Sequence, residues 1–145
     1  MMNASLNKVF QTRAGTGLTI LRLIIGITFM LHGSQKLFGA FGGYGLEGTG
    51  QYMDSLGLHP GYLMALLSGC AEFFGGVAFF IGLLVRPAAI VMAFLLLMAI
   101  FSVHIHNGFF MANNGYEYAL VLLAGVAAVF FDGAGKLSID RKIAG

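Results

Sequence analysis

Four long apolar stretches dominate the hydropathy pattern of the chain. They run over residues 18–38, 62–84, 88–106 and 114–131. A helix needs about 20 residues, at 1.5 Å each, to cross the hydrocarbon core of a bilayer. The first two stretches reach this length within apolar sequence, whereas the others approach it only by including His106 and Asn114. The pattern predicts an all-α membrane protein, in which residues 1–145 form one domain built as a bundle of four transmembrane helices.

Composition supports a membrane location and excludes several classes of function. The chain is 58 % hydrophobic and 10 % charged, whereas soluble domains carry about 25 % charged residues. A net charge of +2 gives no basic patch for nucleic acid. Cys70 is the one cysteine of the sequence, which rules out an intrachain disulfide and a cysteine-ligated iron–sulfur cluster. Redox chemistry would therefore need a quinone, a b-type haem or a partner protein, and we expect no covalently bound cofactor.

Basic residues are distributed asymmetrically between the segments that connect the apolar stretches. With four spans, one side of the bilayer receives the basic residues before or early in the first span, in the turn between the second and third, and after the fourth. These residues are Lys8, Arg13, Arg22, Arg86, Lys136, Arg141 and Lys142. The loop from Ser102 to Tyr116 has no Lys or Arg. The positive-inside rule then predicts that both termini are cytoplasmic, in a multi-pass protein of the bacterial cytoplasmic (inner) membrane.

Polar side chains within the spans are the candidate functional residues. A charge near the bilayer centre costs roughly 3 kcal/mol, and such residues usually have partners that mark a site. Counting 1.5 Å per residue, we expect most of them to lie at similar depths in the outer half of the membrane. The candidates for ligand binding or proton relay are Arg22, His32, Lys36, Glu72, His104, Asn107 and Glu117.

Helical periodicity predicts how these residues meet. Arg22, His32 and Lys36 share one face of the first span, because residues on a helix advance by about 100° each. Small residues three or four positions from Glu72 line its face of the second span and would let another helix approach closely. We therefore expect His32, Glu72 and His104 to converge on one cavity, with Asn107 and Glu117 at its rim.

Two other interpretations of the polar residues stay open. They could form a purely structural network that fixes helix packing, although such contacts average only about 0.6 kcal/mol each in a membrane. A haem between His32 and His104 is compatible with their depths, but no further ligands support it, and we expect neither haem nor a metal site. His104 and His106 point in different directions on a helix, so they could not bind one ion there.

Segments spread over nearly the whole chain resemble, in order, those of the DoxX family of small bacterial membrane proteins. Most of them carry the intramembrane polar residues discussed above. The matching segments are Leu21-Arg22-Leu23, His32-Gly33-x-x-Lys36-Leu37-Phe38-Gly39, Gln51-Tyr52-Met53, Leu56-Gly57, Ala71-Glu72-Phe73-Phe74-Gly75-Gly76, Gly82-Leu83-Leu84-Val85-Arg86-Pro87, His104-x-x-Asn107-Gly108-Phe109-Phe110, Gly115-Tyr116-Glu117-Tyr118 and Gly133-x-Gly135-Lys136-Leu137-Ser138-Ile139-Asp140.

The resemblance implies a four-helix membrane bundle with a connection to quinones. Family members are commonly described as oxidoreductases, and relatives are associated with oxidative-stress defence. On this basis we expect a membrane subunit or accessory of a quinone-linked redox system, with a lipophilic ligand at the polar cluster. His32 or His104 would donate to a quinone carbonyl, and Lys36 or Arg22 would stabilise negative charge on the ligand. Glu72 and Glu117 are the candidate proton relays.

Two alternatives to a redox subunit remain. One is a non-enzymatic membrane scaffold that recruits soluble redox enzymes through its inner face. The other is a small-molecule transporter or channel that uses the same polar cluster. The expected partners are the lipid bilayer, soluble or membrane redox enzymes, and further copies of the chain in a homo-oligomer. The sequence identifies neither the ligand nor the electron donor, so whether the protein is an enzyme stays open.

Overall fold

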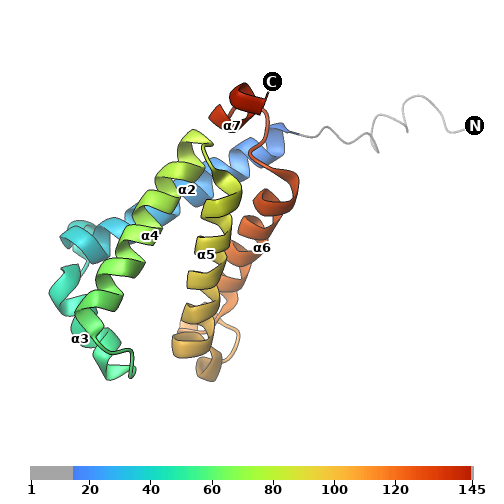
Figure 1. Cartoon of the computed structure of the whole chain (residues 1–145). Helices are drawn as coiled ribbons and strands as arrows, with labels where there is room; N and C mark the ends of the chain where they lie inside the picture. Colours follow the sequence, from blue (N-terminus) through green and yellow to red (C-terminus); the bar gives the residue numbers. More distant parts are fainter. Residues whose placement is uncertain (1–14, 145) are drawn as a thin grey trace, which may run out of the picture.

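The computed structural model describes residues 15–144, and every regular element in that range is helical (Figure 1). Four long helices form the body of the molecule. They are α2 (Thr16–Phe38), α4 (Gly61–Ile81), α5 (Val85–Ala99) and α6 (Glu117–Asp132). Two shorter helices, α3 (Gly45–Ser55) and α7 (Ile139–Ala144), lie at opposite ends of the bundle. Single turns connect them at Ala40–Gly42, Ile105–Asn107 and Met111–Asn113.

The long helices are arranged as two pairs, α2 with α4 and α5 with α6. The pairs lie close together at the end that carries α7 and diverge toward the other end (Figure 1). The buried core joins them at the closed end, through Phe79 of α4, Met92 of α5 and Val126 of α6, each 0 % exposed. Most other large apolar side chains face outward along all four helices, as expected where the surrounding medium is lipid.

Glycine allows α2 and α4 to approach unusually closely. A Cβ atom added at Gly33 of α2 would lie 2.5 Å from the backbone nitrogen of Phe73, and one at Gly76 of α4 would lie 2.6 Å from that of Met30. Such close packing of small residues is typical of helix association in membranes. Gly69 and Gly76 both face α2, which confirms the prediction that the small residues beside Glu72 lie against another helix.

Three helical segments are long and apolar enough to cross a membrane by length and composition. They are Thr16–Phe38, Gly61–Ile81 and the continuous run Val85–Asn107. The second segment therefore ends at Ile81 rather than at residue 84, and the third begins at Val85 rather than at residue 88. The fourth apolar helix, α6, has 16 residues and is shorter than the usual spanning length. A fourth span remains a prediction.

The predicted start of the fourth apolar helix at residue 114 is wrong. Asn114 has a left-handed backbone conformation, with φ 59°, and ends the short turn Met111–Asn113. A left-handed residue cannot continue a right-handed helix, and asparagine tolerates this conformation better than most residues. Helix α6 therefore begins three residues later, at Glu117.

The apolar stretches predict the turn between the second and third helices at residues 85–87, and this position is also wrong. The turn lies at Gly82–Leu84, and Arg86 and Pro87 belong to the first turn of α5 rather than to the connection. Gly82 ends α4 in a left-handed conformation, φ 72°, which glycine adopts without penalty. Proline needs no hydrogen-bond partner for its nitrogen in a first turn.

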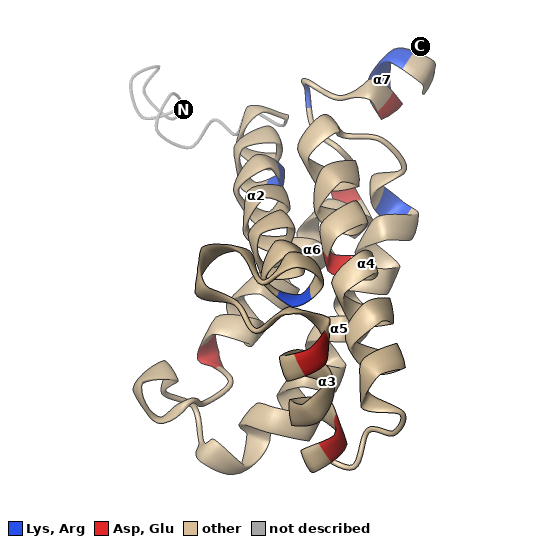
Figure 2. Ribbon diagram, turned by 90° about the vertical axis from the view of Figure 1, so that its left-hand side faces the viewer, with Lys and Arg blue, Asp and Glu red and all other residues tan. Residues whose placement is uncertain are grey.

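Both described ends of the chain lie at the closed end of the bundle. The Lys136 amide donates to the Gly15 carbonyl over 3.1 Å, which brings the tail next to the start of α2. Figure 2 shows basic residues near this end, in the tail, in α7 and at the start of α5, together with an acidic residue in α7, and further acidic residues in α3 and at the start of α6 at the opposite end. The cytoplasmic side of the membrane remains a prediction for the basic end.

Candidate functional site

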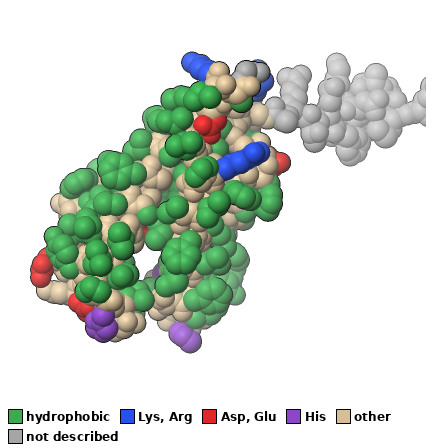
Figure 3. All heavy atoms as spheres, viewed as in Figure 1, with side chains coloured by type: hydrophobic (Ala, Val, Ile, Leu, Met, Phe, Trp, Pro, Cys, Tyr) green, Lys and Arg blue, Asp and Glu red, His purple; other side chains and the backbone are tan. Residues whose placement is uncertain are grey.

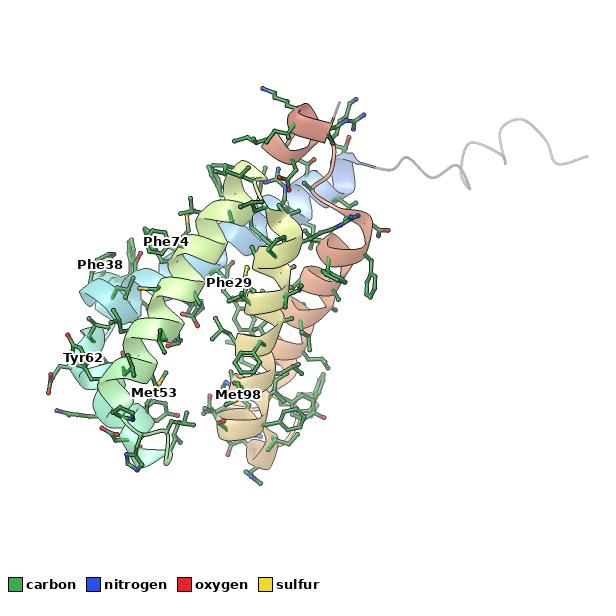
Figure 4. All side chains as sticks on the ribbon, in the orientation of Figure 1. Phe29, Phe38, Met53, Tyr62, Phe74 and Met98 are labelled. Carbon is green, nitrogen blue, oxygen red and sulfur yellow. The ribbon has the colours of Figure 1, made fainter. Side chains whose placement is uncertain are left out.

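A cavity of about 180 Å³ lies between the diverging helix pairs. Figure 3 shows the molecule hollowed between the two pairs, and Figure 4 places Phe29 at the narrow end of this space, with Met53 and Met98 on either side of its wide end. Side chains from both pairs contribute to the lining. The lining residues are Phe29, His32, Glu72, Leu96, Ala99, His104, Tyr118, Ala119 and Leu122.

Lys36 and Glu72 form an ion pair between α2 and α4 beside this cavity. The Lys36 Nζ atom lies 2.5 Å from Glu72 Oε1, and the two side chains are 26 % and 12 % exposed. Glu72 Oε2 is buried and has no hydrogen-bond partner within residues 15–144. Glu72 lines the cavity and Lys36 does not. The lysine balances the charge of the carboxylate through one oxygen and leaves the other oxygen without a partner.

His104 is positioned by an irregularity at the end of α5. The helix widens into a π-helical turn over Ile100–His104 before it ends, and such turns are frequent at functional sites. His104 Nδ1 lies 2.9 Å from the carbonyl oxygen of Asn114. Because a carbonyl only accepts, we assign the proton to Nδ1, which leaves Nε2 of the neutral ring as an acceptor.

His32 and Tyr118 form the third polar part of the lining, from α2 and α6. Their ring centroids are 6.4 Å apart and their planes are tilted by 50°. Neither side chain makes a hydrogen bond to another of the described residues, so both can adapt to a bound molecule. A Tyr hydroxyl can donate or accept, and a neutral imidazole carries one donor and one acceptor.

The structure brings together three of the predicted site residues, His32, Glu72 and His104, at one cavity. Lys36 joins them through Glu72. Asn107 and Glu117 do not line the cavity but order the loop beyond it. Asn107 Nδ2 donates to the Asn114 carbonyl over 3.2 Å, and Glu117 Oε1 accepts from the Met111 amide over 3.0 Å.

The remaining candidate, Arg22, belongs to a different part of the molecule. It is 1 % exposed, and it lies roughly 21 Å along α2 from Lys36 at 1.5 Å per residue. Its guanidinium donates to four backbone carbonyls at the closed end. The acceptors are Phe79, Phe80 at 2.8 Å, Ala134 at 2.8 Å and Leu137 at 2.5 Å. Arg22 therefore joins the end of α4 to the tail and takes no part in lining the cavity.

Tyr118 is the polar lining residue that sequence reasoning missed. A signal was present, because tyrosine carries a hydroxyl group on an apolar ring and usually needs a partner for it when buried. It follows Glu117 directly, at the end of the fourth apolar stretch where the other polar residues gather. Phe29 and Leu122 give no comparable signal, since apolar residues occur all around these helices.

Comparisons with known proteins place the chain among bacterial membrane proteins. The sequence model described as DoxX matches residues 17–105. The chain is 37 % identical over 117 residues to "Putative oxidoreductase CatD" of Bacillus subtilis (strain 168), an alignment that covers 81 % of this chain and 78 % of that protein. It is 31 % identical over 133 residues to "Inner membrane protein YqjF" of Escherichia coli (strain K12), covering 88 % and 92 %. No solved structure matches the chain.

Proposed function

The chain belongs to the DoxX family of membrane proteins, and from this premise we propose that it binds a small lipophilic molecule of the quinone type in the cavity between its helix pairs. In this proposal it serves a quinone-linked redox system of the cytoplasmic membrane as a subunit or accessory. The observation that carries the proposal is the convergence of His32, Glu72 and His104 on one cavity with apolar walls.

The size of the cavity suits a single aromatic ring. An apolar cavity of about 150 Å³ in a protein core is large enough to hold benzene, and this one measures about 180 Å³. Phe29, Leu96 and Leu122 supply apolar walls for a ring. Small-molecule sites commonly combine such walls with a few polar groups that fix orientation, so a ring with one or two oxygen substituents is the matching ligand.

The polar lining suits oxygen substituents that gain or lose protons. A ligand oxygen near Glu72 or His104 would lie beside a group that can accept a proton, and general acid–base chemistry requires contact of this kind. Lys36 keeps the site close to neutral by pairing with Glu72. The name of the Bacillus subtilis relative, which describes an oxidoreductase, supports redox chemistry in the same system.

The alternative function is that of a membrane scaffold, which would bind a partner at the closed end of the molecule. A groove of about 1230 Å³ lies at the closed end, between the start of α2, the α4–α5 turn and α7. Arg86 and Arg141 contribute to its lining together with Asp132 and Asp140. A soluble redox enzyme that docked there would make this end the functional one, and changes in the cavity would then leave function intact.

Retention of lipophilic compounds by the purified protein tests the proposal. We expect mass spectrometry of the protein, extracted in mild detergent, to detect a quinone-type compound that Ala99→Phe removes by filling the cavity. Ala124→Phe is the matched control, because Ala124 is exposed on α6 and does not line the cavity. Equal retention by both variants, or none by the wild type, would contradict binding in the cavity.

A further inference from the structure

We infer that the groove at the closed end of the bundle binds the headgroup of an anionic phospholipid. Arg86 is the principal partner of the lipid phosphate, and Arg141 is the second. Both arginines line this groove, and neither lines the cavity between the helix pairs. The inference is therefore independent of the proposed function, and it adds a binding site at the other end of the molecule.

The Arg86 guanidinium lies at the wall of the groove with most of its donors free. A Cβ atom added at Gly133, which also lines the groove, would lie 3.8 Å from Arg86 Nη2. Within residues 15–144 the guanidinium donates one hydrogen bond, to the Phe131 carbonyl over a long 3.4 Å. A guanidinium has five donors in a planar fork that matches the oxygens of a phosphate. Arg86 can therefore bind a phosphate without giving up a strong contact.

The acidic residues of the groove do not neutralise these arginines. Asp132 forms no ion pair with either of them within residues 15–144. Both carboxylate oxygens of Asp140 accept from backbone amides, over 2.8 and 3.0 Å. The Asp140 amide also donates to the Gly82 carbonyl, and a Cβ atom added at Gly82 would lie 3.0 Å from Arg22 Cζ. Asp140 is thus placed to offset the buried charge of Arg22, which leaves the groove arginines to an external anion.

The depth of the groove matches the layer in which lipid phosphates lie. Arg86 is the second residue of Val85–Asn107, a segment long enough to cross a membrane, and a basic side chain at the end of a span reaches the headgroup layer. Leu84 and Ile143 line the same groove and are 62 % and 73 % exposed. Figure 3 shows the basic side chains at this end among hydrophobic ones. A phosphate joined to acyl chains fits this combination.

A membrane lipid suits the groove better than an acidic soluble protein does. Anionic lipids of the cytoplasmic leaflet attract basic residues near the membrane surface, and they are present at this depth without docking from solution. The groove measures about 1230 Å³, more than the 300–1,000 Å³ of most small-molecule sites, which leaves room for a headgroup and the start of its chains. A soluble protein would have to displace lipid from the exposed apolar residues.

Native mass spectrometry of the purified full chain in detergent tests the inference. Dioleoylphosphatidylglycerol and dioleoylphosphatidylcholine carry the same acyl chains, but the choline cation balances the phosphate of the second lipid. We expect the wild-type protein to bind the anionic lipid at least about tenfold more tightly, because charge-assisted hydrogen bonds to phosphate are the strong ones. A micelle has no anionic surface, so retention reports a site on the protein and does not depend on the orientation in the membrane.

Two double variants with the same loss of charge locate the site. Arg86→Gln with Arg141→Gln removes both groove arginines, and we expect the preference for the anionic lipid to fall below about twofold. Lys136→Gln with Lys142→Gln is the matched control, because these lysines lie at the same end of the molecule but do not line the groove. We expect the control to keep the wild-type preference.

A single change in α7 gives the same comparison at exposed neighbouring positions, where loss of folding is not expected. Arg141→Gln should weaken binding of the anionic lipid about fivefold, the factor that corresponds to about 1 kcal/mol per basic residue at an anionic surface, and Lys142→Gln should leave it unchanged. Equal losses in the arginine and lysine variants would show that charge attracts lipid without a groove site. A wild-type protein that binds both lipids equally, or arginine variants that keep the preference, would also overturn the inference.

Discussion

Glu72 has two carboxylate oxygens in different surroundings, and one of them links α4 to α2 through Lys36. Oε1 pairs with Lys36 at 2.5 Å, whereas Oε2 faces no donor within residues 15–144. Placing a carboxylate in a membrane bundle is costly unless its charge is balanced. The lysine therefore stabilises the ionised carboxylate within the bundle.

The ion pair predicts a dependence of stability on Lys36. We expect Lys36→Met to lower the free energy of unfolding by about 2 kcal/mol, less than the 3–5 kcal/mol typical of a fully buried pair because both side chains are partly exposed. The double variant Lys36→Met with Glu72→Leu should recover most of this loss, since no unpaired charge remains. Unfolding in detergent, followed by circular dichroism, measures both changes. A Lys36→Met protein as stable as the wild type would show that the pair contributes nothing.

Arg22 contributes at the scale of helices, by fixing the end of α4 to the tail. Its guanidinium donates hydrogen bonds to the carbonyls of Phe79 and Phe80 on one side and of Ala134 and Leu137 on the other. Asp140 of α7 adds a second link, because its carboxylate accepts from the amides of Leu84 and Val85 over 2.8 and 3.0 Å. Together these contacts hold the closed end, from which the two helix pairs diverge.

The Arg22 contacts predict that the tail is released when the guanidinium is removed. We expect Arg22→Met to destabilise the protein by more than about 3 kcal/mol, because several carbonyls lose their partner and each buried one costs about 1–3 kcal/mol. Trypsin should then cleave at Lys136 and Arg141 much faster than in the wild type. Arg22→Lys should rescue little, since an ammonium cannot reproduce the planar set of donors. Wild-type rates of cleavage in Arg22→Met would refute this role.

Asp54 links α3 to the start of α4 in a pH-dependent way. Its Oδ1 lies 2.7 Å from His59 Nδ1 and accepts from the Gly61 amide over 2.8 Å. The hydrogen bond with the His59 side chain, followed by that from Gly61, holds the pKa of Asp54 below its ordinary value. Because this pKa is lowered, the ionised Asp54 carboxylate stabilises the folded protein above about pH 4. This stabilisation is lost as the pH falls through the pKa of Asp54 in the folded state.

Hydrogen exchange tests this pH dependence. We expect protection of the first turn of α4 to decrease between pH 5 and pH 3 in the wild type, once exchange rates are corrected for pH. Asp54→Asn should show weaker protection at pH 5 and little further change at pH 3. An identical pH dependence in the two proteins would show that Asp54 does not control this helix end.

Hydropathy predicted the helices well because it depends on local sequence. It failed where a single residue determines where a helix begins or how it ends. Helix α6 begins late because Asn114 is left-handed, and no pattern of apolar residues encodes that. The π-helical turn that positions His104 likewise has no sequence signal. The role of Arg22 at the closed end could not be predicted, because its partners are backbone carbonyls up to 115 residues away in the chain, and carbonyls are present at every position.

The convergence of His32, Glu72 and His104 was accessible from sequence because depth along a helix follows from counting residues. The exposed faces of the whole molecule are apolar on every long helix, so the bilayer rather than water is the medium that surrounds the helix pairs. The cavity lies toward the end of the bundle away from both described chain ends. In the predicted orientation it opens in the outer half of the membrane.

Cysteine labelling from outside the cell tests this orientation. In a Cys70→Ser background, we expect Glu47→Cys in α3 to react with a membrane-impermeant maleimide on intact cells. Lys142→Cys in α7 should react only after the cells are opened, because the positive-inside rule places the basic end in the cytoplasm. The reverse labelling pattern would invert the topology and place the cavity in the inner half of the membrane.

The location of a bound aromatic ring decides whether the cavity between the helix pairs is a binding site. Intermolecular nuclear Overhauser effects can be measured between 4-methylphenol and a deuterated protein with protonated leucine methyl groups, in nanodiscs. We expect contacts to Leu96 and Leu122, which line the cavity. We expect none above the lipid background to Leu67 and Leu120, which are 55 % and 42 % exposed on the outer faces of their helices. Contacts to the exposed leucines alone would show that the ring dissolves in lipid and that the cavity holds no ligand.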